Sequence, residues 1–517
     1  MNPERETTAE PVRAGPWWET RWFVAAIILL AFVPLLYPAI PPLVDLPGHM
    51  GRFRVELDLA HSPDLQRYYT FKWALIGNLG IDLLVIPLAK IFGLELATKL
   101  IVLAIPPLTV AGFLWVAREV HHRIPPTALF ALPFVFGHPF LFGFVNFALS
   151  MALAFVAFGL WLRMARLDVT RLRLVLFVPI SLLLWTVHTY GWGLLGLLAF
   201  SAESVRQHDR GRGWFMAGVH GALHASVMAL PLFLTFYWQS GASSSLATDW
   251  FNFKLKWRWV RMALRDRWDW YDQMSLVVVA LLILGGLFHR KLTFSRNLVF
   301  SSLVLITVYL LLPRIIFGSA YADMRLVPFI FAVILLSMRF KAETHLPTAR
   351  LLAIAGLAFY AVRLAGTTLS LTLASLDQSA KLEALDHVEP GARVLSLVGH
   401  RCNDNWALPR NAHLGALVIV RREGFSNDQW PMIDAKLLGV REEARFGWFA
   451  YDPSEQVRPT RCSNREHWPI NFALSRLPRR EFDYVWLIDP PSYDHGLVTN
   501  MTPLWRGPAS ILYRVNP

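Results

Sequence analysis

One short segment of the 517-residue chain brings together groups able to do acid–base and phosphate chemistry. It reads Pro41-Pro-Leu-Val-Asp45-Leu-Pro-Gly-His49-Met-Gly-Arg52, so a carboxylate, an imidazole and a guanidinium fall within eight residues. A helix starting after Pro47 would put His49 and Arg52 on one face, since they are three residues apart. Asp45 is then suited to take a proton from a hydroxyl or an amine, and the other two groups to bind phosphate. The structural alternative is that Asp45 caps the helix and Arg52 contacts a lipid phosphate.

A second charged group is Tyr321-Ala-Asp323-Met-Arg325, with Arg314 on the other side of a short loop. Arg325 enters an apolar run at its outer end, where an unpaired charge is costly. A bound phosphate would balance that charge, and Arg314 would add a second cation. An ion pair between Arg325 and Asp323 is the alternative that needs no ligand.

Several other polar residues interrupt apolar stretches and are candidates to line a substrate cleft: Asn78, Asp82, His138, Asn146, His188 and Tyr190. The alternative for the histidines is a polar group that faces a helix bundle and is satisfied there. Asn78 and Asp82 are equally compatible with the surface of a helix that lies on a membrane.

The elements that must position these groups are membrane helices. Hydrophobic residues make up 55% of the chain and charged residues 17%, with a mean hydropathy of +0.39, whereas soluble domains are about a quarter charged. A span needs about 20 mostly apolar residues. Runs of that kind begin near Trp22, Ala97, Thr127, Phe142, Leu174, Trp192, Trp214, Leu276, Leu298, Leu326 and Leu351. The sequence therefore predicts a polytopic α-helical membrane protein with about 11 spans.

The basic residues predict its orientation, because cytoplasmic loops are rich in Arg and Lys. With residues 1–21 as a cytoplasmic tail, nearly every alternate loop is basic, which also explains the net charge of +13 without nucleic acid. The assignment requires that the apolar stretch Trp73–Phe92 does not cross the membrane, so we expect it to lie flat on the outer surface or to re-enter. The transmembrane domain then covers 22–375, with a long first outer loop at 41–96.

The outer loop at 240–273 is dense in aromatic and basic residues, against the charge trend. Two interpretations stay open for it. An amphipathic helix anchored at the interface by tryptophan is the one we favour, and a lid over an anionic lipid is the other.

Residues 376–517 are predicted to form an extracytoplasmic soluble α/β domain. Strands are expected at Ala392–Val398, Ala416–Val420, Tyr484–Ile488 and Ser510–Val515, because these are short apolar runs bounded by polar residues. The chain has two cysteines, Cys402 and Cys462, both in this domain. An oxidising compartment would permit a disulfide between them, and two separate reduced thiols are the alternative.

Together these features resemble the GT-C superfamily of membrane glycosyltransferases, which use polyprenyl-phosphate sugars. The likeness is carried by Asp45 just after the first span, by the long first outer loop, and by its closing stretch Phe92-Gly-Leu-Glu-Leu-Ala-Thr-Lys99-Leu. That stretch is similar to one in lipid A aminoarabinose transferases and protein O-mannosyltransferases, with Lys99 where they have Arg. Leu46 stands where the family has a second acidic residue. The segment is most similar to uncharacterised bacterial proteins with Asp-x-Pro-x-His-x-x-Arg in this loop.

The resemblance implies a donor sugar on a polyprenyl phosphate, an extracytoplasmic glycan, lipid or protein acceptor, and a place in the bacterial inner membrane as part of the cell envelope. It implies that Asp45 is the base. Our own assignment puts Arg325, His188, Arg52 and Arg314 on the phosphate, where they would stabilise the leaving group. No cofactor is specified, and a divalent cation stays an open alternative.

Other functional classes receive less support from the sequence. A phosphate-binding glycine loop, a dinucleotide fingerprint and a CxxC pair are all missing. A transporter or flippase, or a non-catalytic subunit of envelope polysaccharide assembly, would also have many spans. Transporters tend to show inverted repeats and polar groups at the midplane, which this sequence lacks. A cleft shared by Asp45, His188 and Arg325 would favour an enzyme.

Overall fold

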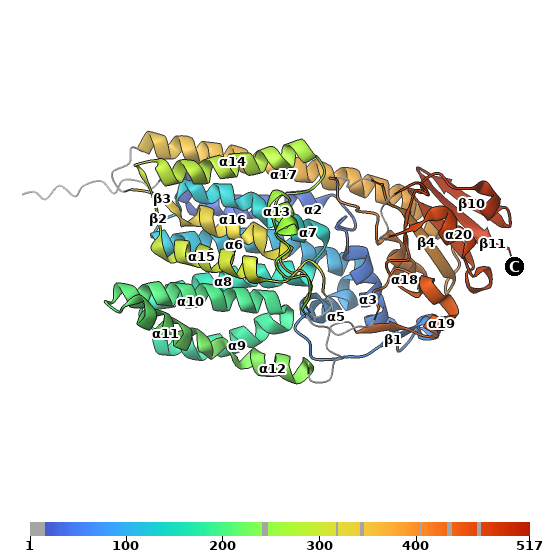
Figure 1. Ribbon diagram of the computed structural model, residues 1–517, viewed down its shortest axis with the longest axis horizontal. Helices are drawn as coiled ribbons and strands as arrows, with labels where there is room; N and C mark the ends of the chain where they lie inside the picture. Colours follow the sequence, from blue (N-terminus) through green and yellow to red (C-terminus); the bar gives the residue numbers. More distant parts are fainter. Residues whose placement is uncertain are drawn as a thin grey trace, which may run out of the picture.

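The chain forms a bundle of long helices at one end and an α/β domain at the other (Figure 1). It is described by a computed structural model for residues 16–239, 247–316, 319–341, 346–402, 406–431, 437–462 and 467–516. The helix α17 (Leu346–Leu382) runs along the bundle and continues into the α/β domain. The two ends of the molecule are thereby joined by one continuous helix.

Five described helices are long and apolar enough to cross a membrane: α6 (Leu94–His121), α8 (Val145–Arg166), α9 (Thr170–Val187), α14 (Asp269–Phe288) and α17. The other apolar runs form shorter or less apolar helices: α1 (Arg21–Leu30), α2 (Val33–Leu36), η2 (Pro126–Phe136), α7 (His138–Phe142), α10 (Thr189–Asp209), α11 (Trp214–Ala225), α12 (Leu230–Gln239), α15 (Arg296–Leu311), η4 (Met324–Leu326) and α16 (Val327–Ser337). The count of about 11 spans stays a prediction.

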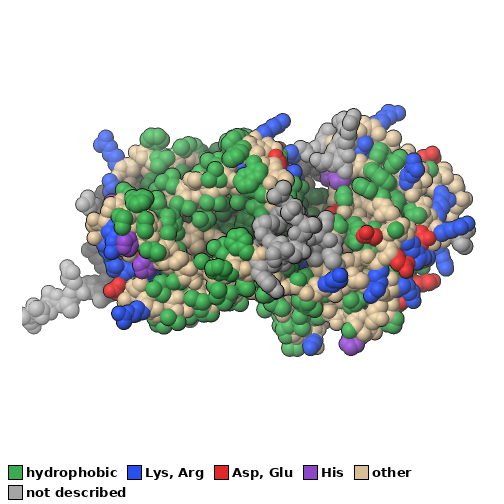
Figure 2. Space-filling view, turned by 60° about the horizontal axis from the view of Figure 1, so that its bottom comes forward, with side chains coloured by type: hydrophobic (Ala, Val, Ile, Leu, Met, Phe, Trp, Pro, Cys, Tyr) green, Lys and Arg blue, Asp and Glu red, His purple; other side chains and the backbone are tan. Residues whose placement is uncertain are grey.

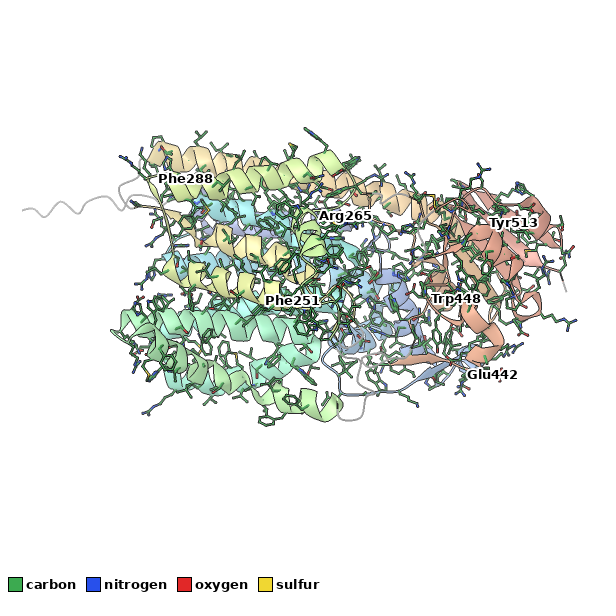
Figure 3. The ribbon with its side chains drawn as sticks, viewed as in Figure 1. Phe251, Arg265, Phe288, Glu442, Trp448 and Tyr513 are labelled. Atoms are coloured by element: carbon green, nitrogen blue, oxygen red, sulfur yellow. A yellow bond between two sulfur atoms is a disulfide. The ribbon has the colours of Figure 1, made fainter. Side chains whose placement is uncertain are left out.

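The outer surface of the bundle is apolar. Hydrophobic side chains cover much of it, while charged side chains gather over the α/β domain and at the opposite end (Figure 2). Phe215 is 81% exposed and Phe288 83% exposed, and Figure 3 shows Phe288 on the outside of α14. An apolar surface of this extent is unfavourable in water, so it is suited to contact with lipid chains.

The basic loops meet at the end of the bundle away from the α/β domain. There β2 (Leu292–Phe294) pairs antiparallel with β3 (Met338–Phe340). Ion pairs join the neighbouring loops, among them Arg166–Glu119 at 2.8 Å and Arg296–Asp209 at 2.6 Å. The loops predicted to be cytoplasmic therefore share one face of the molecule.

The apolar stretch at 73–92 contains only one short helix, α5 (Gly80–Phe92), which packs against α6. A helix of 13 residues rises about 20 Å, which is less than the ~30 Å hydrocarbon core of a bilayer. It lies between the bundle and the α/β domain (Figure 1).

The α/β domain is built on a mixed seven-stranded sheet in the order β10-β11-β9-β4-β7-β8, with β5 also paired to β4. Its strands are β4 (Arg393–Gly399), β5 (Phe425–Ser426), β7 (Gln456–Arg458), β8 (Trp468–Pro469), β9 (Tyr484–Ile488), β10 (Met501–Gly507) and β11 (Ser510–Val515). Short helices surround it: η5 (Glu383–His387), α19 (Glu443–Phe446), η7 (Gly447–Ala450), α20 (Ile470–Ser475), η8 (Arg479–Glu481) and η9 (His495–Val498). Cys402 and Cys462 are joined by a disulfide.

Three of the four predicted strands are confirmed, as β4, β9 and β11. The strand predicted at Ala416–Val420 is wrong, because this run forms the end of η6 (Leu414–Ala416) and most of α18 (Leu417–Arg422). A short buried apolar run does not by itself distinguish a helix from a strand. Here α18 packs against α3 (Leu46–Asp58) instead of joining the sheet.

The first outer loop is part of the α/β domain's structure. After α3 and α4 (Pro63–Tyr68), the strand β1 (Tyr69–Phe71) pairs antiparallel with β6 (Leu438–Val440). Val55 and Leu65 are fully buried in the same apolar core as the sheet. The segment that carries Asp45 is therefore held between the bundle and the domain.

Arg410 links three parts of the chain at this junction. Its buried guanidinium donates to the carbonyl of Pro42 and to Asp266, at 2.5 Å from the latter. Asp266 lies between α13 (Phe253–Arg261) and α14, and it also accepts from Ser370 of α17 at 2.7 Å. These bonds fix the α/β domain to the bundle directly before Asp45.

We expect Arg410→Met to lower the free energy of unfolding by about 3–5 kcal/mol, because it leaves the buried Asp266 carboxylate without its ion pair. The measurement is the unfolding midpoint in detergent, followed by tryptophan fluorescence. Arg421→Met is the control, since Arg421 pairs with Glu95 at the surface and its loss should cost under about 1 kcal/mol. Equal shifts for the two variants would contradict the role given to Arg410.

Candidate functional site

A large cavity lies where the bundle meets the α/β domain. Its volume is about 1490 Å³, compared with about 300–1,000 Å³ for typical small-molecule pockets. The sequence-predicted residues that line it are Asp45, His49, Arg52, Asn78, His138, Asn146, His188, Tyr190, Arg314 and Arg325. Asp82 and Asp323 do not line it. Asp45, His188 and Arg325 therefore share one cavity.

The backbone places Asp45 at the cavity wall. Its N–H donates to the carbonyl of Phe142 at 2.9 Å, which fixes the loop after α2 to the end of α7. Gly143 has a φ of +101°, and a Cβ there would lie 2.6 Å from the Asp45 nitrogen, so only glycine fits. Asp45 precedes α3 in the N-cap position, but its side chain accepts no capping hydrogen bond. Its carboxylate is thus available to the cavity.

A histidine from the α/β domain faces Asp45. His413 Nε2 lies 3.7 Å from Asp45 Oδ1, while His413 Nδ1 lies 2.7 Å from Asp428 Oδ1. Burial raises the pKa of Asp45 to about 7, against the opposing effect of His413. For His413 burial acts to lower the pKa, but Asp428 outweighs it and the pKa rises to about 10. A carboxyl with a pKa near neutrality can exchange a proton with a substrate.

Arg325 supplies a positive charge to another part of the wall. It is 7% exposed, and its guanidinium donates to Ser319 Oγ and the Ala320 carbonyl, with His188 Nε2 at 3.5 Å. Among the described residues it has no ion pair with a carboxylate, and its Nε has no hydrogen-bond partner. The predicted alternative partner, Asp323, pairs instead with Lys256 at 3.2 Å. A buried, unbalanced guanidinium beside a cavity is suited to an anionic ligand.

Other predicted phosphate-binding cations are paired with acids. Arg52 lies 2.7 Å from Asp82, and both are buried. Asn146 donates to Asp82 and to Asn78, at 3.0 and 3.1 Å, so these polar residues form one network that joins α3, α5 and α8. Arg314 pairs with Asp249 at 2.5 Å. Arg325 is therefore the predicted cation most open to a ligand.

The remaining predicted residues, Tyr190, His188 and His138, contribute aromatic rings to the cavity wall. The Tyr190 hydroxyl donates to the carbonyl of Ala322, which holds α10 beside the Arg325 segment. His188 Nδ1 accepts from the Tyr190 N–H at 3.1 Å. His138 is 2% exposed, and neither of its ring nitrogens has a hydrogen-bond partner among the described residues.

The aromatic loop contributes to the cavity through α13. On one face, Leu255, Arg258 and Trp259 line the cavity. On the other, Phe253 and Trp257 are 59% and 65% exposed. The arrangement combines features of the lid and of the interfacial anchor. Figure 3 shows Arg265, which follows α13, at the junction of bundle and domain, and residues 240–246 of the predicted loop lie outside the described residues.

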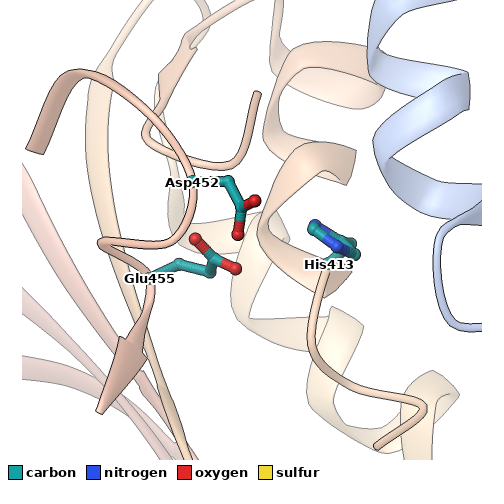
Figure 4. A group of neighbouring side chains, drawn as sticks. All are labelled: His413, Asp452 and Glu455. Atoms are coloured by element: carbon teal, nitrogen blue, oxygen red, sulfur yellow. The ribbon is translucent and has the colours of Figure 1, made fainter. Parts of the chain in front are cut away.

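Sequence reasoning missed the residues that the α/β domain contributes. His413, Asp428, Trp430, Asp452 and Glu455 lie near Asp45 or near one another. A ring nitrogen of His413 and carboxylate oxygens of Asp452 and Glu455 lie within 4.8 Å of one another (Figure 4), so these three residues could hold a metal ion. The only signal in the sequence was the polar run Ser426-Asn-Asp-Gln429 inside an apolar domain, and this run is fully or almost fully buried.

Two solved structures of ArnT from Cupriavidus metallidurans, one bound to undecaprenyl phosphate and one in the apo state, align with 96% of this chain and 98% of theirs. The sequence identities are 12% and 13%, and the TM-scores are 0.46 and 0.47. No protein-family model matches the chain, and no curated protein matches it.

We expect Glu56→Gln to stabilise the protein at high pH. Burial, with Asp82 nearby, raises the pKa of Glu56 to about 8, and neither carboxylate oxygen has a hydrogen-bond partner among the described residues. Because the folded-state pKa is raised, the ionised carboxylate costs stability increasingly between pH 4.5 and 8. The free energy of unfolding should be equal for wild type and variant near pH 4, and it should be higher for the variant by about 1–3 kcal/mol at pH 9. The measurement is the unfolding transition of both proteins at the two pH values.

The exposed Glu442→Gln is the matched control and should show no such pH-dependent difference. A constant difference between Glu56→Gln and wild type at all pH values would contradict the assignment.

Proposed function

We propose that this protein is a membrane glycosyltransferase that moves a sugar from a polyprenyl-phosphate donor to an acceptor hydroxyl or amine. The observation that carries the proposal is the shared cavity. It combines an unpaired buried guanidinium, Arg325, with a buried carboxylate, Asp45, whose pKa lies near 7. A transfer reaction of this kind needs a cation for the departing phosphate and a base for the acceptor.

The walls of the cavity support a lipid-linked donor. Apolar side chains from membrane-side helices line part of it, including Leu194 and Leu197 of α10 and Val308 of α15. The polar wall comes from the α/β domain and from the segment around Arg325. A molecule with an isoprenoid chain and a phosphate-linked sugar matches both parts, whereas a wholly water-soluble donor would leave the apolar wall unused.

In the proposed reaction, Asp45 accepts the proton of the acceptor group as its oxygen or nitrogen attacks the anomeric carbon. The bond between that carbon and the phosphate oxygen breaks, with inversion at the carbon. Arg325 stabilises the charge that develops on the departing polyprenyl phosphate. His413 lies 3.7 Å from Asp45 and its charge favours the ionised carboxylate that is needed to start.

We propose that the α/β domain faces the extracytoplasmic side of a bacterial inner membrane. The end of the bundle opposite this domain carries the basic loops, which the positive-inside rule assigns to the cytoplasm. The Cys402–Cys462 disulfide fits an oxidising compartment for the domain. The acceptor is accordingly an extracytoplasmic glycan, lipid or protein.

Asp45→Asn should lower turnover by about 100- to 10,000-fold, because the amide cannot accept the acceptor's proton. The measurement is sugar transfer from a panel of radiolabelled polyprenyl-phosphate sugars by purified protein. Donor binding should be retained, and Asp58→Asn on the surface of α3 serves as the control with wild-type turnover. No binding and no transfer by the wild type with any donor would overturn the proposal in favour of a transporter or a non-catalytic subunit.

Arg325→Gln should weaken binding of polyprenyl phosphate about 10- to 100-fold, since it removes charged hydrogen bonds to the phosphate. Arg314→Gln should weaken it less, because Arg314 is already paired with Asp249. Binding is measured by the quenching of tryptophan fluorescence on titration with the lipid phosphate in detergent. An equal loss for both variants would contradict the specific role of Arg325.

A further inference from the structure

We propose that His413, Asp452 and Glu455 bind a divalent cation, Mn²⁺ or Zn²⁺, in the α/β domain directly beside Asp45. Of the three, His413 lies closest to the first outer loop, with its Nε2 3.7 Å from Asp45 Oδ1. The inference deepens the proposed function, on which its catalytic meaning depends, but binding of the cation can be measured without any donor.

The distances fit a single ion. Bonds from Zn²⁺ to imidazole nitrogen and carboxylate oxygen are about 2.0–2.2 Å long, so two ligand atoms of one ion lie at most about 4.4 Å apart. In the protein the three candidate ligand atoms lie within 4.8 Å of one another, which small side-chain movements would close. Figure 4 shows the carboxylates of Asp452 and Glu455 directed toward each other and toward the His413 ring.

Glu455 provides a second, independent indication of a ligand. Its side chain is fully buried, and Oε2 has no hydrogen-bond donor as a partner among the described residues. Asp452 is the neighbouring carboxyl, and the two groups can share a hydrogen bond only when one of them holds a proton. Two carboxylates in this position repel each other unless a proton or a cation lies between them.

The three residues belong to a group that is rich in carboxyls. Asp45, Asp428, Asp452 and Glu455 surround one imidazole, and among the described residues no Arg or Lys forms an ion pair with any of them. Buried carboxylates are usually paired or bound to a metal. A divalent cation would supply the balance that the protein's own side chains do not.

His413 is oriented as a metal ligand by Asp428. Its Nδ1 lies 2.7 Å from Asp428, so the proton on that nitrogen is directed to the carboxylate, and a bound cation would displace the proton from Nε2, which then becomes the ligand atom. A histidine that donates to a carboxylate through its other nitrogen is the usual arrangement at metal sites. One nitrogen with two or three oxygens suits Zn²⁺ or Mn²⁺ better than Ca²⁺, which prefers six to eight oxygens.

The sheet creates the space for the site. Along one side of β4, the pairing partner changes from β5 at Val394 to β7 at Val398. Between them Asn427 bonds the backbone N–H of Ser396 at 2.9 Å and Ser454 at 3.0 Å. In this gap between β5 and β7, β4 is hydrogen-bonded by a side chain instead of a strand. Asp428 and Glu455 directly follow Asn427 and Ser454 in the chain, so both acids lie close to the gap.

With respect to the proposed reaction, the ion would lie next to the base. It would help to hold the acceptor or the phosphate in the cavity, while the proton transfer remains with Asp45. Three protein ligands leave at least one coordination position for such a group.

The experiment measures Mn²⁺ binding to the full-length protein in detergent by electron paramagnetic resonance, with Zn²⁺ as competitor. The protein is first treated with a chelator and dialysed. We expect about one Mn²⁺ per chain, displaced by Zn²⁺, and an affinity at least tenfold lower for Glu455→Gln and for Asp452→Asn. Asp489→Asn is the control: Asp489 lines the same cavity but pairs with Lys381 at 3.2 Å, and its loss should leave the affinity unchanged.

Unfolding midpoints of the chelated proteins establish that the variants are folded. Adding Mn²⁺ should then raise the midpoint of wild type and of Asp489→Asn, but not that of Glu455→Gln. No stoichiometric binding by the wild type, or equal affinity in all variants, would overturn the cation site. Cation binding together with no sugar transfer from any donor would leave the site in place and count against the glycosyltransferase alone.

Discussion

The contact on which the cavity depends is the buried guanidinium of Arg410 between Pro42 and Asp266. It joins the α/β domain to the loop before Asp45 and to the junction of α13 and α14. A buried ion pair contributes little net stability over apolar packing, but removal of one partner is costly. The pair therefore acts mainly to fix one relative position of the two halves, and both walls of the cavity follow from that position.

The groups that line the cavity come from both halves of the molecule. Asp45 precedes α3 and His413 comes from the α/β domain, whereas Arg325 lies in η4 of the helical bundle. A ligand that fills the cavity would therefore contact both halves of the molecule, with Asp45 and Arg325 on its walls.

Sequence patterns predicted those features that depend on local composition. The apolar runs form helices, the strands β4, β9 and β11 occur at short apolar runs bounded by polar residues, and the segment 45–52 lies at a cavity. The sequence did not show which charged side chains form ion pairs, because Arg52 meets Asp82 only after α5 has packed against α3 and α8. The contribution of His413 was missed for the same reason, since nothing near it in the sequence shows that it meets Asp45. The Ala416–Val420 error shows that a buried run of five residues lacks the length to reveal its period.

The pairing of β1 with β6 delays the folding of the first outer loop while the chain is being synthesised. The two strands lie about 370 residues apart, as the bond between Thr70 and Gly439 shows. A chain emerges from the ribosome at about 5–20 residues per second, so the first outer loop waits tens of seconds for its partner. During that time Asp45 has neither His413 nor a closed cavity. The cavity around Asp45 is consequently incomplete until the last fifth of the chain has folded, and a product truncated before His413 lacks the wall that the α/β domain supplies.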